Sequence, residues 1–156
     1  MAQQIIGRDS EKSRLKQALI SEQSELIAIY GRRRVGKTFL IREFFKKQIV
    51  FEVSGLADGS MPDQIENFHK ALRKVSKKAK GDSSQWLAVF TELENYLDSL
   101  RSKKKKVIFI DEFPWMDTPR SKFLMTFENF WNSYCTKRKD LIVVVWGSDA
   151  SYMVKK

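Results

Sequence analysis

Short apolar runs alternate along the chain with longer segments whose apolar residues recur every three or four positions. Four of these runs, at residues 26–30, 49–53, 107–110 and 141–146, are rich in β-branched side chains and end at glycine, serine or acidic residues. Such runs are typical of strands. Because nearly every position in them is apolar, we expect strands that are covered on both faces of a sheet.

The segments between these runs predict helices. Their apolar positions indicate helices over residues 9–21, 38–47, 86–100 and 119–137, and another that begins near Pro62. The last of these carries an aromatic face that we expect to be core: Phe123, Phe127, Phe130, Trp131 and Tyr134. Alternating strands and helices predict an α/β fold in which a mainly parallel sheet lies between two layers of helices.

Length and composition limit the possible organisation. The chain has 156 residues and no repeat or long linker, so we treat residues 1–156 as a single domain. With one cysteine, Cys135, and one histidine, His69, it has too few ligands for a structural zinc site and no internal disulfide. No run reaches the ~20 apolar residues of a membrane span. We therefore expect a cytoplasmic protein.

The charge is strongly basic. Lys and Arg number 29 against 19 Asp and Glu, which gives a net charge of +10. Such a balance favours anionic partners, whether nucleotide, nucleic acid or a membrane surface, but does not choose among them.

A phosphate-binding pattern follows the first predicted strand. Residues 31–38 match G-x-x-x-x-G-K-[ST] in full, and the match lies between a strand and a helix as the pattern requires. The matching residues, all predicted to bind nucleotide, are Gly31, Arg32, Arg33, Arg34, Val35, Gly36, Lys37 and Thr38.

Each part of this loop has a chemical role. Glycines let the main chain approach an anion, and amides at the start of the next helix point at phosphates. Lys37 would bridge the β- and γ-phosphates, and the Thr38 hydroxyl would bind Mg²⁺. The three arginines either strengthen the phosphate site or are solvated and only steer anions toward it.

Acidic residues end the third predicted strand. Asp111 and Glu112 follow an apolar run, which would place both carboxylates at the carboxyl edge of the sheet. There Asp111 would orient a Mg²⁺-bound water, while Glu112 would polarise the water that attacks the γ-phosphate.

Ser148 follows the fourth predicted strand. Its hydroxyl would reach the attacking water or the γ-phosphate, or it would cap the next helix. The two roles are compatible, and we include Ser148 among the catalytic candidates.

The chain resembles the archaeal-type P-loop ATPases of archaea and bacteria, within the wider AAA+ and STAND group. The resemblance covers nearly all of the chain. Its most discriminating parts are the arginine-rich loop 31–38 and the Asp-Glu-Phe-Pro-Trp run at 111–115; segments 6–9, 130–132 and 146–148 add to it.

This resemblance implies a P-loop fold of the additional-strand, catalytic-glutamate class that uses ATP. The implied strand order is fifth, first, fourth, third, second. In relatives the segment that matches Ile6, Gly7 and Arg8 lies beside the adenine; here these residues either contact the base or pack the entry to the first helix.

The chain is shorter than the family pattern. Relatives continue with a fifth strand and a helical lid that carries a sensing arginine, and a neighbouring subunit can supply an arginine finger. We therefore expect a piece truncated at its C-terminus, without fifth strand and lid, with weak or no ATP hydrolysis by itself. The first strand would lie at a sheet edge, and an unpaired edge favours self-association into a homo-oligomer.

The main functional hypothesis is an ATP- and Mg²⁺-dependent ATPase core that drives a conformational or partner switch. The alternative is a nucleic-acid-binding module with a basic surface, carried by Lys70–Lys80 or by Arg101–Lys106. Neither cluster interleaves aromatic residues, so solvated helix ends are the simpler interpretation. A P-loop kinase is disfavoured by Glu112 and by the lack of an identifiable acceptor pocket.

Overall fold

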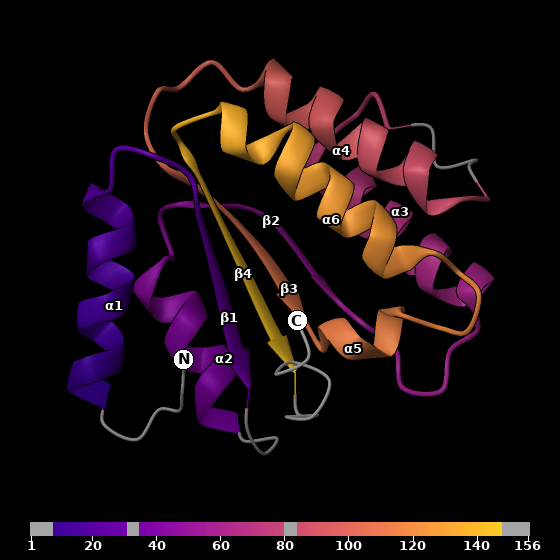
Figure 1. Cartoon of the computed structure of the whole chain (residues 1–156), viewed down its shortest axis with the longest axis horizontal. Helices are drawn as coiled ribbons and strands as arrows, with labels where there is room; N and C mark the ends of the chain where they lie inside the picture. The colour runs from indigo at the N-terminus through magenta and orange to yellow at the C-terminus, as the bar shows by residue number, and fades with distance from the viewer. Residues whose placement is uncertain (1–7, 31–34, 80–83, 148–156) are drawn as a thin grey trace.

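The computed structural model describes residues 8–30, 35–79 and 84–147. Within them four parallel strands form one sheet in the order β1-β4-β3-β2 (Figure 1). The strands are β1 (Glu25–Tyr30), β2 (Ile49–Ser54), β3 (Lys106–Asp111) and β4 (Leu141–Gly147). This confirms the predicted parallel sheet with the first strand at an edge, and the order agrees with the one that the resemblance implies for these four strands.

Helices cover both faces of the sheet (Figure 1). The helices α1 (Arg8–Ile20) and α2 (Val35–Phe44) lie on one face; α3 (Met61–Val75), α4 (Trp86–Ser99) and α6 (Phe123–Ser133) lie on the other. Each layer has its own apolar core, one built around Phe45 and Phe109 and the other around Phe68 and Phe90. The three-layer α/β prediction is therefore confirmed.

Burial explains why the two central strands are almost entirely apolar. Every position of β3 and β4 is buried, because each strand has a neighbour on both sides and helices above and below. Side chains alternate between the faces, so Phe109 enters the α1/α2 core while Ile108 and Ile110 enter the α3/α4/α6 core.

The structure corrects two predicted helices and adds two short elements. The helix expected over residues 38–47 is α2, which begins earlier, at Val35, and ends at Phe44. α6 begins at Phe123 rather than near residue 119, because Arg120 and Lys122 have positive φ angles of 59° and 62° that a right-handed helix does not allow. After Ser133 the chain continues as a 3₁₀ helix, η1 (Cys135–Lys137). A four-residue helix, α5 (Phe113–Met116), follows β3 and was not predicted.

The aromatic face of α6 forms part of the core, as expected. Phe123, Phe127 and Phe130 are buried, and Trp131 and Tyr134 pack against the same cluster while partly exposed. Cys135 also belongs to the core, since its thiol is buried and free.

The outer edge of β2 is partly covered by side chains. The hydroxyl of Tyr96 donates to the main-chain oxygen of Val50 at 2.8 Å, and the amide of Asn67 donates to that of Ser54 at 2.7 Å. Occupied carbonyl groups make an edge a poorer template for another strand. Self-association through the β1 edge stays a prediction.

Candidate active site

A threonine and an aspartate from distant parts of the sequence meet at the carboxyl edge of the sheet. Thr38 lies in the first turns of α2, and Asp111 is the last residue of β3. The Thr38 hydroxyl Oγ1 donates to the Asp111 carboxylate oxygen Oδ2 at 3.1 Å across 73 residues of sequence. The structure thus brings together the two residues predicted to hold a metal ion.

The Asp111 carboxylate lies in a poorly solvated environment. The residue is 8% exposed, and burial raises the pKa of its carboxyl, although hydrogen bonds from Thr38 and from the Glu112 main chain and the charge of Arg42 oppose that rise. Its other oxygen, Oδ1, is buried and has no hydrogen-bond partner among the described residues. A bound cation would stabilise such a carboxylate in its charged form.

The chemistry of these groups fits Mg²⁺. A hydroxyl and a carboxylate are hard oxygen ligands, and Mg²⁺ is held by one or two such protein groups together with waters and substrate phosphates. The described part of the chain contains no group of three or more His, Cys, Asp or Glu side chains that could chelate a metal without a substrate. The site therefore suits a metal that arrives with a polyphosphate.

Glu112 follows in an unusual main-chain conformation. Its φ and ψ are 51° and 46°, in the left-handed region that non-glycine residues seldom occupy, and its side chain is buried. The Glu112 carbonyl accepts a hydrogen bond from the Trp115 amide at 3.1 Å, which begins α5. Such conformations concentrate at functional sites, where the surrounding structure holds them in place.

Gly55 is the functional residue that sequence reasoning did not identify. It follows β2, next to β3 in the sheet, and its amide donates to the Asp111 carbonyl at 2.9 Å. A Cβ at Gly55 would lie 2.5 Å from the Glu112 carbonyl oxygen and 3.1 Å from Trp115 Cβ. The available signal was its position directly after the strand next to the acidic one.

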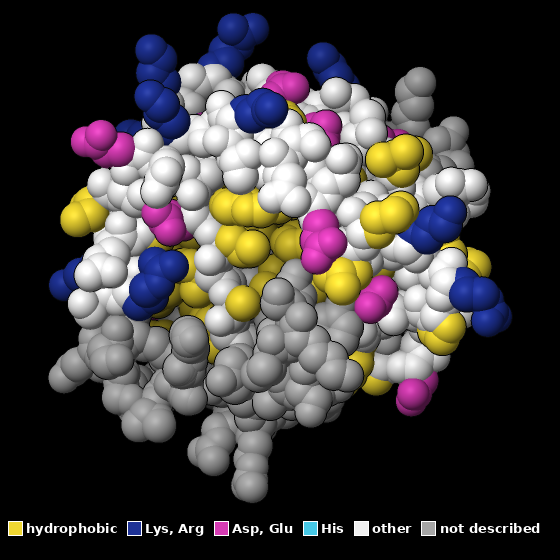
Figure 2. Space-filling view, viewed as in Figure 1, with side chains coloured by type: hydrophobic (Ala, Val, Ile, Leu, Met, Phe, Trp, Pro, Cys, Tyr) yellow, Lys and Arg dark blue, Asp and Glu magenta, His cyan; other side chains and the backbone are white. Residues whose placement is uncertain are grey.

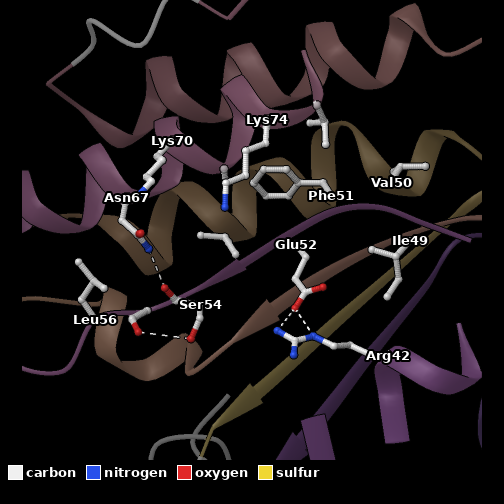
Figure 3. A pocket seen from close by; sticks show the side chains of 14 residues that line it. Arg42, Ile49, Val50, Phe51, Glu52, Ser54, Leu56, Asn67, Lys70 and Lys74 are labelled. Carbon is white, nitrogen blue, oxygen red and sulfur yellow. Dashed lines mark hydrogen bonds and ion pairs between the residues drawn. The ribbon is translucent and has the colours of Figure 1, made fainter. Parts of the chain in front are cut away.

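A second polar group lies one strand away from the acids. Arg42, in the last turn of α2, donates from Nε to Glu52 Oε2 of β2 at 2.6 Å. This pair lines a cleft of about 570 Å³ along the outer edge of β2, with Asn67, Lys70 and Lys74 of α3 on its other side (Figure 3). Thr38 and Asp111 are not among the described residues that line this cleft, although the charges of Arg42 and Glu52 both act on the Asp111 carboxyl.

Several predicted site residues cannot be placed by the structure. Seven lie outside the described residues: Ile6, Gly7, Gly31, Arg32, Arg33, Arg34 and Ser148. Four others are described as helical main chain only: Arg8, which begins α1, and Val35, Gly36 and Lys37, which begin α2. The roles given to these residues stay predictions.

A family described as an ATPase domain predominantly from Archaea matches residues 6–156 of the chain. An uncharacterised protein of Methanocaldococcus jannaschii is 28% identical over 153 residues, a stretch that covers 97% of this chain and 31% of that protein. The chain therefore spans about a third of the length of this relative.

Two solved structures share the fold. The Walker-type ATPase of Pyrococcus abyssi superposes with a TM-score of 0.60 at 19% identity, over 92% of this chain and 45% of that one. The ORC2 protein of Aeropyrum pernix, solved in ADPNP and ADP complexes, gives 0.59 at 17% identity, over 98% and 44%. Here too the chain spans less than half of the similar structures.

Proposed function

The chain belongs to the family of ATPase domains found predominantly in Archaea, and from this premise we propose that it binds ATP with Mg²⁺ and hydrolyses it at the carboxyl edge of its sheet. The observation that carries the proposal is the hydrogen bond between Thr38 and Asp111. It joins the end of the phosphate-binding pattern to the acidic end of β3, as a metal site shared by the two motifs requires.

The first turn of α2 would hold the phosphates. Its leading amides have no partner within the helix, so they are available to an anion, and the helix dipole favours negative charge at this end. Lys37 would neutralise the β- and γ-phosphates, with Gly31–Arg34 completing the loop. Ile6, Gly7 and Arg8 are the proposed contacts of the adenine.

Thr38 and Asp111 would hold Mg²⁺ between them and the phosphates. When bound, the ion would neutralise charge on the β- and γ-phosphates. The Glu112 carboxylate would orient and deprotonate the attacking water, and the Ser148 hydroxyl would donate to that water or to the γ-phosphate. The left-handed main chain at Glu112 supports a functional role for this residue, because such conformations concentrate at functional sites.

Further features are proposed from the resemblance. They are membership of the AAA+ and STAND group, coupling of hydrolysis to a conformational or partner switch, a cytoplasmic location, and a homo-oligomer that supplies an arginine finger. No helix in the described ranges is long and apolar enough to cross a membrane.

Nucleotide binding tests the proposal directly. We expect Lys37→Ala to weaken the affinity of a fluorescent ATP analogue about 10- to 150-fold, the range for a lost hydrogen bond to a charged group. Glu112→Gln should bind the analogue normally, and any hydrolysis seen in the parent chain should stop.

Lys46→Ala is the matched control. Lys46 is exposed and lies just after α2, so its substitution removes the same charge without touching the phosphate loop. An affinity of Lys37→Ala equal to that of the parent chain, with or without Mg²⁺, would refute the proposed site.

A further inference from the structure

Three loops lie together at the amino end of the sheet, opposite the candidate active site. Lys105 Nζ donates to the Gln23 carbonyl at 2.8 Å and to the Lys139 carbonyl at 3.0 Å. These bonds tie the loop before β3 to the loop before β1 and to the loop before β4. Lysines far apart in the sequence therefore share one surface.

Two acidic side chains of this region, Asp140 and Asp98, are already engaged by neighbouring groups. Asp140 accepts hydrogen bonds from Arg138 at 2.9 and 2.7 Å and from Lys106 at 2.8 Å. Asp98 accepts from the Tyr134 hydroxyl at 2.6 Å. Lys106 is buried at 3% exposure and belongs to this internal network, so it is not part of the exposed basic cluster in which the sequence had placed it.

The remaining basic side chains have no such counter-charges. The amino-edge surface comprises five exposed cations that form no ion pair with another described residue: Arg101, Lys103, Lys104, Lys137 and Lys139. One exposed acid, Glu22, lies in the loop before β1, next to Gln23, whose carbonyl Lys105 binds. Figure 2 shows Lys and Arg side chains projecting from the upper rim, over the loops that Figure 1 places there.

The composition of this surface favours a phosphodiester backbone as its partner. Lysines are flexible point charges that neutralise phosphates without reading bases. The aromatic side chain described beside the amino-edge surface, Tyr134, stacks on Phe130 and is covered by the Arg138 guanidinium, so its ring is not free to stack on single-stranded bases. Among the large exposed apolar side chains of the described residues, only Ile20 lies close in sequence to one of the three loops. The amino-edge surface therefore lacks the apolar face that would insert into a lipid surface.

We propose that the amino-edge surface binds the backbone of double-helical nucleic acid without sequence preference. This inference does not depend on ATP binding. The surface begins where β3 begins, and Asp111 stands at the far end of the same strand. A bound duplex and a nucleotide would therefore occupy opposite edges of the sheet and would not compete.

Fluorescence anisotropy with a labelled 20-base-pair DNA duplex tests the proposal, with an RNA duplex of the same sequence in a second arm. If five or six phosphates are neutralised, affinity should fall roughly 10³-fold between 50 and 200 mM salt. The variant K103Q/K104Q/K137Q should bind at least about tenfold more weakly at low salt, and its loss over the same range should be only about 10- to 40-fold, because two or three neutralised phosphates remain.

The matched control is K12Q/K16Q/K122Q. These three lysines are exposed on α1 and just before α6, outside both basic clusters of the sequence, and their replacement lowers the net charge equally. It should retain the affinity and salt slope of the parent chain within about twofold. Equal losses in both variants would mean that net charge alone attracts the duplex, and would overturn the assignment.

A competition assay with saturating ATP and Mg²⁺ distinguishes duplex binding at the amino-edge surface from duplex binding at the arginine-rich loop 31–38. Duplex affinity should not change, whereas strong competition would place the duplex at the phosphate loop and refute the proposal. Binding to vesicles of anionic lipid without binding to duplex would refute it as well. If the chain binds no ATP, the proposed ATPase function is refuted, whereas the lysine variants still test duplex binding at the amino-edge surface.

Discussion

Gly55→Ala tests how the acidic turn is held in place. The added methyl group would lie 2.5 Å from the Glu112 carbonyl oxygen, whereas ordinary Cβ contacts lie at 3.4–4 Å and contacts below 3.0 Å essentially never occur. The two segments must therefore separate by about 0.5–0.9 Å. The atom that the methyl group would meet first, the Glu112 oxygen, is main chain, and the Gly55 amide is bonded to the Asp111 carbonyl, so a side-chain movement cannot relieve this contact.

The expected consequence is slower hydrolysis with little change in binding. A misplacement of about 1 Å can lower a rate about 10²-fold, so we expect kcat to fall roughly 10- to 100-fold. Nucleotide affinity should stay within about threefold, because the added Cβ would meet Glu112, Trp115 and Met116, none of which is proposed to hold the nucleotide. Overpacking of this kind costs about 1–3 kcal/mol in the free energy of unfolding.

Two measurements on the same protein give a complete test. Single-turnover hydrolysis with saturating ATP reports the rate, and residue-resolved amide hydrogen exchange reports the geometry independently of activity. The amides of residue 55 and Trp115, which donate to Asp111 and Glu112, should exchange faster in Gly55→Ala. Amides in the middle of α3 should exchange as in the parent chain, once corrected for global stability.

Gly59→Ala is the control in the same loop. Its added Cβ would meet the Gln64 side-chain nitrogen at 2.7 Å, away from the acidic turn. We expect it to lower stability while keeping kcat within about twofold. Our reasoning is wrong if Gly55→Ala keeps both its exchange protection and its rate, or if Gly59→Ala slows hydrolysis equally.

Three further substitutions probe buried polar groups. Burial raises the pKa of the Asp111 carboxyl, so the charged carboxylate lowers the stability of the folded state once the pH is above the ordinary aspartate pKa. Asp111→Asn should therefore raise Tm at pH 7 by about 1–4 °C, as measured by calorimetry. The same substitution should abolish the Mg²⁺-dependent part of the nucleotide affinity. Burial alone would raise the pKa of Asp140, but Arg138 and Lys106 lower it to about 2. The stabilisation from this lowered pKa is present at pH values above the aspartate pKa of the unfolded chain, and it is lost as the pH falls toward 2. Asp140→Asn should therefore lower the free energy of unfolding in urea by roughly 1–2 kcal/mol at pH 7 and by much less at pH 2.5. Gln64, 1% exposed, bonds both main-chain groups of Leu56, and Gln64→Leu should lower stability by about 2–4 kcal/mol in the same assay.

Patterns of local sequence predicted the sheet correctly, and they named the two residues, Thr38 and Asp111, that the fold brings into contact. The strand assignments rested on short apolar runs, and the match at residues 31–38 together with the acids at 111 and 112 indicated which strand ends would meet. The bond between Thr38 and Asp111 agrees with that inference. These features were predictable because hydrophobic period and motif spacing are properties of contiguous residues.

Features that depend on contacts across the fold were not predictable in this way. The positive φ angles of Arg120 and Lys122 delay α6, although neither residue type is a turn signal. Lys106 reads as part of a basic run, but the structure places it under the loops beside Asp140. Gly55 was visible only as the end of a strand, since its close approach to Glu112 depends on which strands are neighbours.

The direction of the Asp111 side chain follows from alternation along β3. Phe109 packs in the core beneath α1 and α2, and a strand places every second residue on the same face, so Asp111 faces the helix that carries Thr38. A slip of one residue would exchange Phe109 with Ile110 between two filled cores and would turn Asp111 away from Thr38. Burial of the whole strand therefore fixes the metal pair. The same alternation would direct Glu112 to the opposite face if the strand continued, but β3 ends at Asp111 and Glu112 adopts a left-handed conformation that packs closely against Gly55.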